Sequence, residues 1–371
     1  MTSIERLREA LHHREPDRVP LDLGGIVSGI SLFAHRALCK YLGFQAEEAL
    51  IDRTQYLVRP APEILELFDI DTRYAYEEIP KEVWQKDKEG SLWTDAWGVV
   101  RRFTGLYYDM VSHPLATVAT HEDLRLYTIP GPPREFFKQL RPELEAHKQK
   151  GKVAMVNCIG SVFEFAWYLR GFSQFMLDLA TQPSMACAIM DVLLDFQMRQ
   201  FDELLKRVGD LVDVVLVGDD LATQKGPLIS LEVYRKYIKP HQKTLYTFIK
   251  ERTKAPLFYH SCGAVEPFLP DLIEIGVDII NPVQVSASGM DTKRLKKLYG
   301  SELTFWGGID TQRVLPFGTP EEVREEVQRR IDDLAPGGGY VLCAVHNIQA
   351  DVPPENIVAL YEEALRYGER G

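Results

Sequence analysis

Residues 256–281, PLFYHSCGAVEPFLPDLIEIGVDIIN, contain the pattern that decides the fold. Pro256–His260 is a short apolar run, Val265–Glu274 has the apolar spacing of a helix, and Asp278–Asn281 is a second short apolar run. A strand, a helix and another strand in this order form one βαβ unit of a parallel sheet. The rest of the chain repeats this alternation.

Eight apolar runs of this kind can be counted, and they are Val19–Leu23, Asp71–Ala75, Val153–Cys158, Asp213–Val217, Pro256–His260, Asp278–Asn281, Leu303–Trp306 and Tyr340–Cys343. Further helix patterns cover Leu231–Lys250, Thr292–Leu298 and Pro320–Leu334. The last of these begins with Thr319-Pro320, a capping residue followed by proline at the first helical position. Eight strands with intervening helices predict an α/β protein built as a closed (β/α)8 barrel, the TIM barrel. No GxGxxG or Walker-type loop follows the first strand to indicate a nucleotide site.

The chain of 371 residues is long for one domain, but a barrel with insertions commonly reaches this length. We therefore predict a single domain over residues 1–371. Between strands 2 and 3, extended segments at Glu82–Asp87 and Ser91–Arg102 around a Lys88-Glu89-Gly90 turn predict a β-hairpin insertion at about residues 80–110. Its aromatic side chains either line a pocket for a planar ligand or pack the hairpin onto the barrel, and they are Trp84, Trp93, Trp97, Phe103, Tyr107 and Tyr108.

Composition excludes several classes of function. A hydrophobic content of 45% is that of an ordinary globular protein, and a net charge of −11 argues against nucleic acid or anionic lipid as partners. The N-terminal segment lacks the apolar core of a signal peptide, and no apolar stretch has membrane-spanning length, so we expect a cytoplasmic protein. The five cysteines are an odd number spread through a long chain, which predicts reduced thiols that are free to bind metal.

Three residues form a candidate metal site. His260 and Cys262 lie two positions apart at the end of a predicted strand, so strand alternation points both side chains to one side. Cys343 ends the last predicted strand, and all strands of a barrel open onto the same face at their C-terminal ends. One imidazole and two thiolates suit zinc and leave a fourth position for substrate. The alternative is a buried thiol beside a hydrogen-bonded histidine.

Four segments carry a family resemblance. GDDLATQKGPLIS (218–230), YHSCGAVEPFLPDLIEIGVDIINPVQ (259–284), FWGGIDTQRVLP (305–316) and HNIQADVPPENI (346–357) resemble the uroporphyrinogen decarboxylase superfamily, over most of residues 1–371. The His-x-Cys pair with a later cysteine is similar to the zinc site of its cobalamin-dependent methyltransferase branch. By this resemblance His260, Cys262 and Cys343 are the zinc ligands, and the substrate heteroatom is the fourth.

The resemblance also implies an activity. Uroporphyrinogen decarboxylase itself holds substrate carboxylates with an arginine-bearing loop after its first strand, whereas residues 21–31, LDLGGIVSGIS, contain no arginine, which argues against decarboxylation of a porphyrinogen. The branch moves methyl groups between a corrinoid protein and a thiol or a methylated substrate. We expect O-demethylation of a methoxylated aromatic compound, with methylation of a thiol of the coenzyme M type as the alternative.

Further polar residues follow the predicted strand ends. Asp219 and Asp220 are candidates for orienting substrate, moving a proton or binding the metal in its resting state, and Glu164 is a candidate for the last role. Helix or loop capping is the alternative for all three. Candidates for hydrogen bonds to substrate are Asn281, Gln284, Asp310, His346, Asn347 and Gln349, although loop geometry explains these positions equally well.

The expected partner is a separate corrinoid protein that carries the cobalamin. No Asp-x-His-x-x-Gly run of the type used by corrinoid-binding domains is present in this chain. Two rival functions are a metal-free lyase that decarboxylates a small acid and a non-catalytic binding protein that keeps the barrel. The assembly state is left open, with a homodimer as one alternative.

Overall fold

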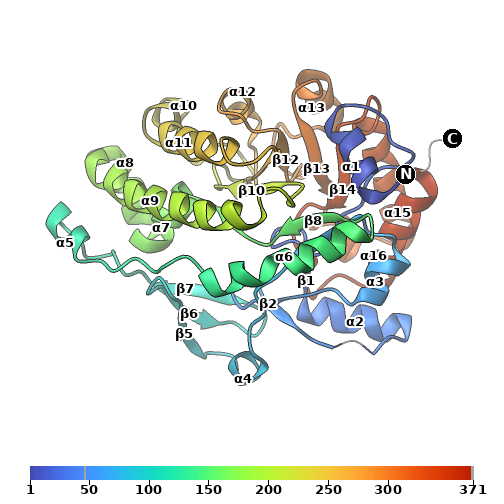
Figure 1. Cartoon of the computed structure of the whole chain (residues 1–371), viewed down its shortest axis with the longest axis horizontal. Helices are drawn as coiled ribbons and strands as arrows, with labels where there is room; N and C mark the ends of the chain where they lie inside the picture. The colour runs from blue at the N-terminus through green and yellow to red at the C-terminus, as the bar shows by residue number, and fades with distance from the viewer. Residues whose placement is uncertain (46, 369–371) are drawn as a thin grey trace.

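A parallel sheet forms the centre of the molecule in the computed structural model, which describes residues 1–45 and 47–368. Six strands lie side by side in the order β14-β13-β12-β11-β10-β9, and all their pairings are parallel (Figure 1). The strands are β9 (Ile159–Gly160), β10 (Val215–Gly218), β11 (Leu257–His260), β12 (Ile279–Asn281), β13 (Thr304–Ile309) and β14 (Tyr340–Ala344).

Two further strands, β4 (Thr72–Ala75) and β8 (Val153–Val156), form a second parallel pair. Backbone hydrogen bonds connect this pair to the six-stranded sheet at both sides. Asp213 N donates to Ala154 O (2.9 Å) on one side, and on the other Asp71 N donates to Leu21 O (3.0 Å) while Leu21 forms a parallel bridge with Leu342. These connections follow the order that a ring of eight strands requires, and closure of the ring stays a prediction.

All the predicted strands except the first coincide with observed strands. The Val19–Leu23 run forms only the bridge at Leu21. Pro20 lacks a backbone N–H and cannot donate to a neighbouring strand, so the ladder does not extend here.

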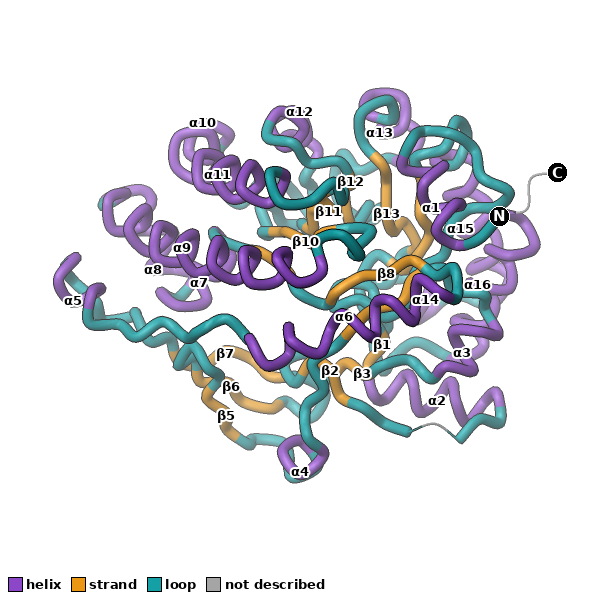
Figure 2. Tube along the Cα trace, viewed as in Figure 1, coloured by secondary structure: helices purple, strands orange, loops and turns teal. Residues whose placement is uncertain are grey.

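Helices follow the strands and cover the outside of the sheet (Figure 2). Pro320–Leu334 is a helix with the predicted ends, and Thr319 caps it by accepting a hydrogen bond from Glu322 N. The helical elements are α1 (Ser3–Leu11), α2 (Leu32–Leu42), α3 (Pro62–Leu67), α5 (His121–Arg125), α6 (Arg134–Gln149), α7 (Phe163–Arg170), α8 (Phe172–Thr181), α9 (Pro183–Val208), α10 (Leu231–Val233), the π-helix η1 (Tyr234–Ile238), α11 (Lys239–Lys250), the 3₁₀-helix η2 (Glu266–Phe268), α12 (Leu269–Glu274), α13 (Thr292–Tyr299), α14 (Val314–Phe317), α15 (Pro320–Leu334) and α16 (Pro354–Gly368).

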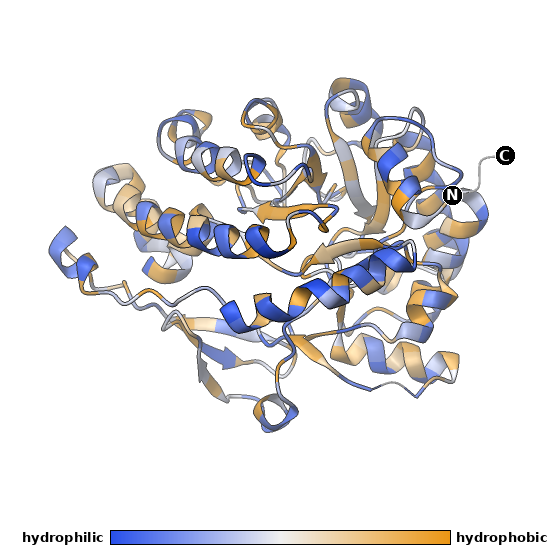
Figure 3. Ribbon diagram, in the orientation of Figure 1, coloured by the Kyte–Doolittle hydropathy of each residue, from blue (hydrophilic) through white to orange (hydrophobic). Residues whose placement is uncertain are grey.

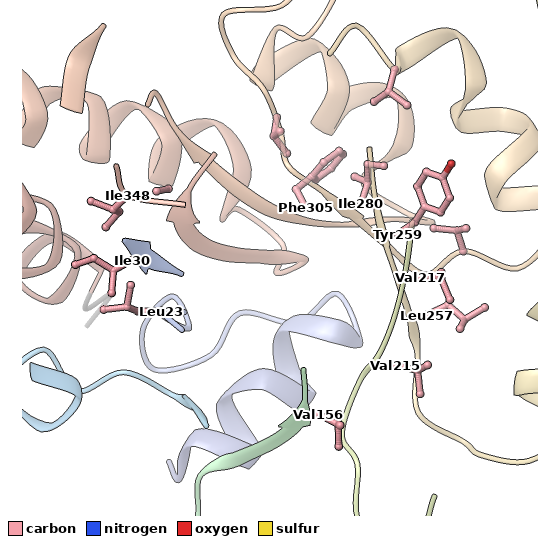
Figure 4. Packing of buried hydrophobic residues seen from close by; sticks show 14 of the residues in the cluster. Leu23, Ile30, Val156, Val215, Val217, Leu257, Tyr259, Ile280, Phe305 and Ile348 are labelled. Carbon is pink, nitrogen blue, oxygen red and sulfur yellow. The ribbon is translucent and has the colours of Figure 1, made fainter. Parts of the chain in front are cut away.

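The strands bury both faces. In β11, Leu257 and Tyr259 belong to a large apolar cluster that also includes residues of the covering helices, whereas Phe258 belongs to a second cluster with Trp306 and Cys343. Figure 4 shows part of the larger cluster, and the hydropathy colouring of Figure 3 shows hydrophobic strands beneath helices with hydrophilic outer faces. Because side chains alternate along a strand, His260 lies on the same face as Phe258.

Between β4 and β8 the chain forms a three-stranded antiparallel sheet of β5 (Leu92–Thr94), β6 (Val100–Phe103) and β7 (Tyr108–Ser112). It lies at the lower left of Figure 1. The predicted extended segment Glu82–Asp87 is wrong, because α4 (Lys81–Trp84) forms there after Pro80. The predicted Lys88-Glu89-Gly90 turn is present, since Ser91 N donates to Lys88 O (2.8 Å), but it leads from α4 into β5. The predicted extended segment Ser91–Arg102 is divided by a further turn between β5 and β6, where the Asp95 carboxylate accepts hydrogen bonds from the backbone of Trp97 and Val99.

A second antiparallel sheet, in the order β1-β3-β2, follows the first strand region. Its strands are β1 (Ile30–Ser31), β2 (Leu50–Asp52) and β3 (Leu57–Val58). Strands this short carry too few residues for a periodic pattern, so the sequence did not predict them. Among the described residues, no helix combines the length and hydropathy needed to cross a membrane.

Candidate metal and substrate site

Three side chains with metal-binding atoms converge at the C-terminal ends of β11 and β14. The ligand atoms of His260, Cys262 and His346 all lie within 4.8 Å of one another. Cys262 Sγ is 3.6 Å from His260 Nε2, and the centres of the two imidazole rings are 5.8 Å apart. The group therefore combines two imidazoles with one thiol, a donor set that suits zinc.

A neighbouring amide fixes the protonation of His260. Asn281 Nδ2 donates to the carbonyl oxygen of Trp306 (3.0 Å), which leaves its side-chain oxygen to face His260 Nδ1 at 2.6 Å. The hydrogen of the ring therefore resides on Nδ1, and the lone pair on Nε2 points toward Cys262. This is the arrangement of a metal-binding histidine that is oriented by a second residue.

Cys343, predicted as the third zinc ligand, lies outside this group. Its thiol donates to the carbonyl oxygen of Ala344 (3.2 Å), and its side chain is buried in the cluster that contains Trp306 and Val341. In register it is opposite Gly308, which has no side chain. His346, for which a hydrogen bond was predicted in place of metal binding, occupies the third position just beyond β14, after Val345 N has continued the pairing with β13 by donating to Ile309 O (2.8 Å).

Burial keeps the histidines of this group neutral and its thiol protonated. Burial lowers the pKa of His346 to about 3 and also lowers the pKa of His260, although the charge of Asp220 opposes the effect at His260. Burial and the charges of Asp220 and Glu164 raise the pKa of Cys262. A divalent cation would reverse the balance at Cys262 by favouring the thiolate, so metal binding and proton release are coupled here.

Two of the predicted carboxylates lie next to the three side chains His260, Cys262 and His346, which we call the metal-type group. Asp220 accepts a hydrogen bond from Cys262 N (2.8 Å), and its own backbone N donates to Glu164 (3.3 Å). The hydroxyl of Tyr168 donates to the other oxygen of Glu164. Burial, together with the charges of Asp220 and Asp219, raises the pKa of Glu164 to about 8. Glu164 is thus a group that can hold a proton at neutral pH beside the site.

Asp219 has a structural role, because its carboxylate oxygens accept hydrogen bonds from surrounding protein groups. One of its oxygens accepts hydrogen bonds from the Ser161 hydroxyl and from the backbone of Val162 and Glu164, and the other accepts one from Gln242. The donors Ser161, Val162 and Glu164 lie at the beginning of α7, so Asp219 caps that helix and positions Glu164. Its side chain is buried, and burial raises its pKa to about 6.

Most of the residues that were predicted to contact substrate form hydrogen bonds to the backbone of loops. Gln284 accepts a hydrogen bond from Gly263 N (2.6 Å) behind Cys262, and Asp310 accepts one from Gln312 N (2.9 Å). Asn347 binds Gly29 N (2.6 Å) and Ile26 O (2.9 Å). Gln349 lies apart from the metal-type group, in a separate cavity formed with the tip of the insertion.

An aromatic cavity of about 320 Å³ lies between the insertion and the ends of β8 and β9. Trp93 and Trp97 of the insertion line it, whereas Phe103 and Tyr108 pack against each other with ring centres 5.1 Å apart. Some aromatic side chains of the insertion thus line a cavity and others pack against each other, and a planar ligand in this cavity stays a prediction. Ile26 lines this cavity, and its carbonyl oxygen accepts a hydrogen bond from Asn347, the residue after His346.

Sequence reasoning missed Tyr168 and Gln242. Tyr168 is one helical turn after Glu164, a spacing that brings two side chains together, so this contact had a detectable signal. Gln242 donates a hydrogen bond to Asp219 from α11, and no local sequence pattern predicts a hydrogen bond between residues of two different secondary-structure elements.

Curated relatives fall into two groups by name. A methylated-thiol–coenzyme M methyltransferase of Methanosarcina mazei is 24% identical over 47% of this chain and 43% of its own length. A methylcobamide:CoM methyltransferase of the same organism is 27% identical over 56% of this chain and 58% of its own length. A uroporphyrinogen decarboxylase of Geobacter sulfurreducens is 23% identical over 72% of this chain and 76% of its own. The chain thus spans less than half of the first of these relatives.

Among solved structures, a methyltransferase from Methanosarcina mazei superposes with a TM-score of 0.67 at 18% identity, covering 99% of both chains. At this identity the similarity shows a shared fold. The sequence pattern of the uroporphyrinogen decarboxylase (URO-D) family matches residues 110–367, which is more than half of the chain. With the parallel sheet described above, this match places the protein: the chain belongs to the uroporphyrinogen decarboxylase family.

Proposed function

We propose that this chain is a zinc-dependent methyltransferase that moves a methyl group between a small molecule and the cobalt of a separate corrinoid protein. The observation that carries the proposal is the convergence of His260 and Cys262, with Nε2 of His260 left free by its bond to Asn281. The names of two relatives, a methylcobamide:CoM methyltransferase and a methylated-thiol–coenzyme M methyltransferase, support the same chemistry.

The ligands that we propose are His260, Cys262 and Cys343. His260 and Cys262 already converge, and Cys343 lies near the end of β14 in the same inner cluster as Phe258, on whose face of β11 His260 lies. His346 lies beside this set and competes for the third place. When bound, zinc would supply a Lewis acid that polarises the heteroatom carrying the methyl group or holds a thiol as its thiolate.

The chain's own residues have separate roles in this proposal. Asn281 orients His260, and Asp220 holds the backbone of Cys262. Glu164 holds a proton near the site and can deliver it to an oxygen that loses its methyl group, because its raised pKa places the proton there at neutral pH. Asp219 keeps Glu164 in place through the cap of α7.

The methyl donor that we propose is a methoxylated aromatic compound. The cavity lined by Trp93, Trp97 and Phe165 supports this choice, since aromatic rings bind a planar ligand by stacking and by burial of its apolar surface. The hydrogen bond between Ile26, which lines the cavity, and Asn347, the residue after His346, supports a substrate path from the cavity to the metal ligands.

Methylation of a thiol is the second candidate. The names of the two coenzyme M methyltransferases favour it, since in both the acceptor is a thiol compound. A lyase is the third, because a larger share of the chain aligns with relatives named uroporphyrinogen decarboxylase. Residues 21–31 contain no arginine for substrate carboxylates, which weighs against the lyase.

One experiment separates these functions. Purified protein is mixed with reduced cob(I)alamin and a panel of methoxylated aromatics, methylamines and methylated thiols, and methylation of cobalt is followed by absorbance. We expect methylation with methoxylated aromatics and its loss in Cys262→Ala. Transfer from methylcobalamin to thiols alone would favour the second candidate. Release of carbon dioxide from a carboxylated substrate, by protein without zinc, would contradict the proposal.

A further inference from the structure

The aromatic cavity beneath the insertion contains more than aromatic rings. Trp97 packs edge-on against Phe196 and Phe165, with ring centres 4.6 Å and 5.9 Å apart, and Trp93 lines the same space. The π faces of such rings carry partial negative charge and attract cations.

Two carboxylates, Asp52 and Glu77, line the same cavity. Asp52 accepts a backbone hydrogen bond from Gln55 (2.5 Å), a contact that orients it but brings no positive charge. Burial raises the pKa of Asp52, although the hydrogen bond from Gln55 and the charge of Arg101 oppose the effect, and partial desolvation raises the pKa of Glu77, whose side chain is exposed to solvent. A positively charged ligand would offset the desolvation of both carboxylates, and most of all that of Asp52.

The cationic side chain that lines the cavity is already paired. Arg53 donates to both oxygens of Asp87 and to the hydroxyl of Tyr108 (3.2 Å). Its guanidinium carbon lies 4.9 Å from the ring centre of Trp93, so this ring already takes part in one cation–π contact. No other lysine or arginine lines the cavity among the described residues. The cavity therefore carries an excess of negative charge and has no free partner for a carboxylate.

We infer that this cavity binds an organic ammonium cation with an apolar or aromatic body, and that it excludes aromatic carboxylates. Trp93, Trp97 and Phe196 would enclose the alkylated ammonium group, and Asp52 and Glu77 would supply the counter-charge. A carboxylated aromatic of the same size would meet two carboxylates without an arginine to bind it.

This inference deepens the proposed function, on which it rests for turnover, because it assigns the charge of the methyl-bearing substrate. Methoxylated aromatics with an ammonium side chain would then be better methyl donors than methoxybenzoates. Binding to the cavity does not depend on methyl transfer, so the two ideas can fail separately.

Binding is tested with three probes of similar shape on the purified chain. They are benzyltrimethylammonium, its neutral isostere neopentylbenzene, and the anion phenylacetate. Trp93 and Trp97 report binding through tryptophan fluorescence, and calorimetry confirms the affinity. We expect the cation to bind about tenfold more tightly than the neutral isostere, and the anion to bind more weakly than either.

Substitutions locate the site. Asp52→Asn keeps the oxygen that accepts from Gln55 N, so the double variant with Glu77→Gln removes charge and retains shape. We expect this variant to lose most of the preference for the cation. Asp109→Asn with Glu89→Gln, two exposed positions of the same region, is the matched control and should keep it. Equal binding of cation and neutral isostere, or an unchanged preference in the Asp52/Glu77 variant, would overturn the inference. Intact cation binding without any methyl transfer would instead contradict the proposed function.

Discussion

Nδ1 of His260 lies 2.6 Å from the side-chain oxygen of Asn281, whose amide nitrogen donates to the carbonyl oxygen of Trp306. The two residues end adjacent strands and are opposite each other in register. The strand register thus places the Asn281 amide beside the His260 imidazole. Because the carbonyl oxygen of Trp306 accepts from the amide nitrogen, the amide oxygen faces the imidazole. Asn281, a residue outside the metal-type group, therefore determines which ring nitrogen of His260 carries the hydrogen.

Replacement of Asn281 by leucine should weaken zinc binding about 10- to 100-fold, because the imidazole loses its orientation and its fixed tautomer. Asn281→Asp keeps an acceptor toward Nδ1 and should bind zinc more tightly than the leucine variant. Competition with a chromophoric chelator measures both affinities. Equal zinc affinity in the leucine variant and the unmodified chain would show that Asn281 has no role in orienting His260.

The strand pattern was readable from sequence, because a strand buried on both faces is a short continuous apolar run. The first strand is the exception, since Pro20 interrupts the ladder that its apolar residues suggest. An antiparallel sheet lies in the region of the predicted insertion, but the first predicted segment is wrong, because Pro80 followed by residues 81–84 favours a helical turn that alternation alone does not reveal.

The site was readable only in part. His260 and Cys262 converge because strand alternation is a local rule. The position of His346 depends on a loop that bonds to Ile309 and to Gly29, and contacts so distant in sequence leave no local pattern. For the same reason Asp219 and Asn347 were candidates for substrate contact although they hold α7 and the 26–29 loop.

Asp71 should be the most costly single charge to remove at the opposite end of the sheet. Its buried carboxylate accepts hydrogen bonds from Arg6 (2.6 Å), Arg18 (2.7 Å) and Leu21 N (2.8 Å). Asp71→Asn removes the one buried charge that Arg6 and Arg18 share and leaves each guanidinium with a single, more exposed carboxylate, Asp17 or Asp69, so the free energy of unfolding should fall by about 3 kcal/mol. Urea denaturation followed by circular dichroism measures this loss.

The control for this prediction is Asp17→Asn. Asp17 also pairs with Arg6, but it is 38% exposed, so its removal should cost about 1 kcal/mol or less. A loss at Asp71 no larger than that at Asp17 would contradict the structural role of the buried pair.

Glu164 should make the stability of the chain depend on pH. Its pKa is about 8 in the folded chain against 4.5 for the free side chain, so between these values the folded state holds a proton that the unfolded state has released. The stabilisation from this group is complete below pH 4.5 and is lost as the pH rises through 8, with a slope of at most about 1.4 kcal/mol per pH unit. The unmodified chain should therefore lose stability relative to Glu164→Gln as the pH rises from 5 to 8.5, and the difference between their unfolding free energies measures this loss. A difference that stays constant across this range would show that Glu164 is ionised throughout.

Metal-binding measurements on variants of Cys343 and His346 can decide which of the two residues is the third zinc ligand. Cys343 supplies a second thiolate, which would neutralise the two positive charges of the ion together with Cys262, whereas His346 supplies a neutral nitrogen that already lies within 4.8 Å of the other two ligand atoms. If Cys343 is the ligand, as we propose, Cys343→Ser should lose zinc at limiting metal concentration, and His346→Gln should keep one equivalent. In protein loaded with cobalt(II) in place of zinc, the near-ultraviolet absorption from thiolate-to-metal charge transfer should fall by about half in Cys343→Ser, because one of two metal–sulfur bonds is lost. The opposite pattern, with metal lost from His346→Gln and the absorption unchanged in Cys343→Ser, would assign the site to His260, Cys262 and His346. The thiol of Cys343 would then keep its hydrogen bond to Ala344 in the metal-bound protein as well.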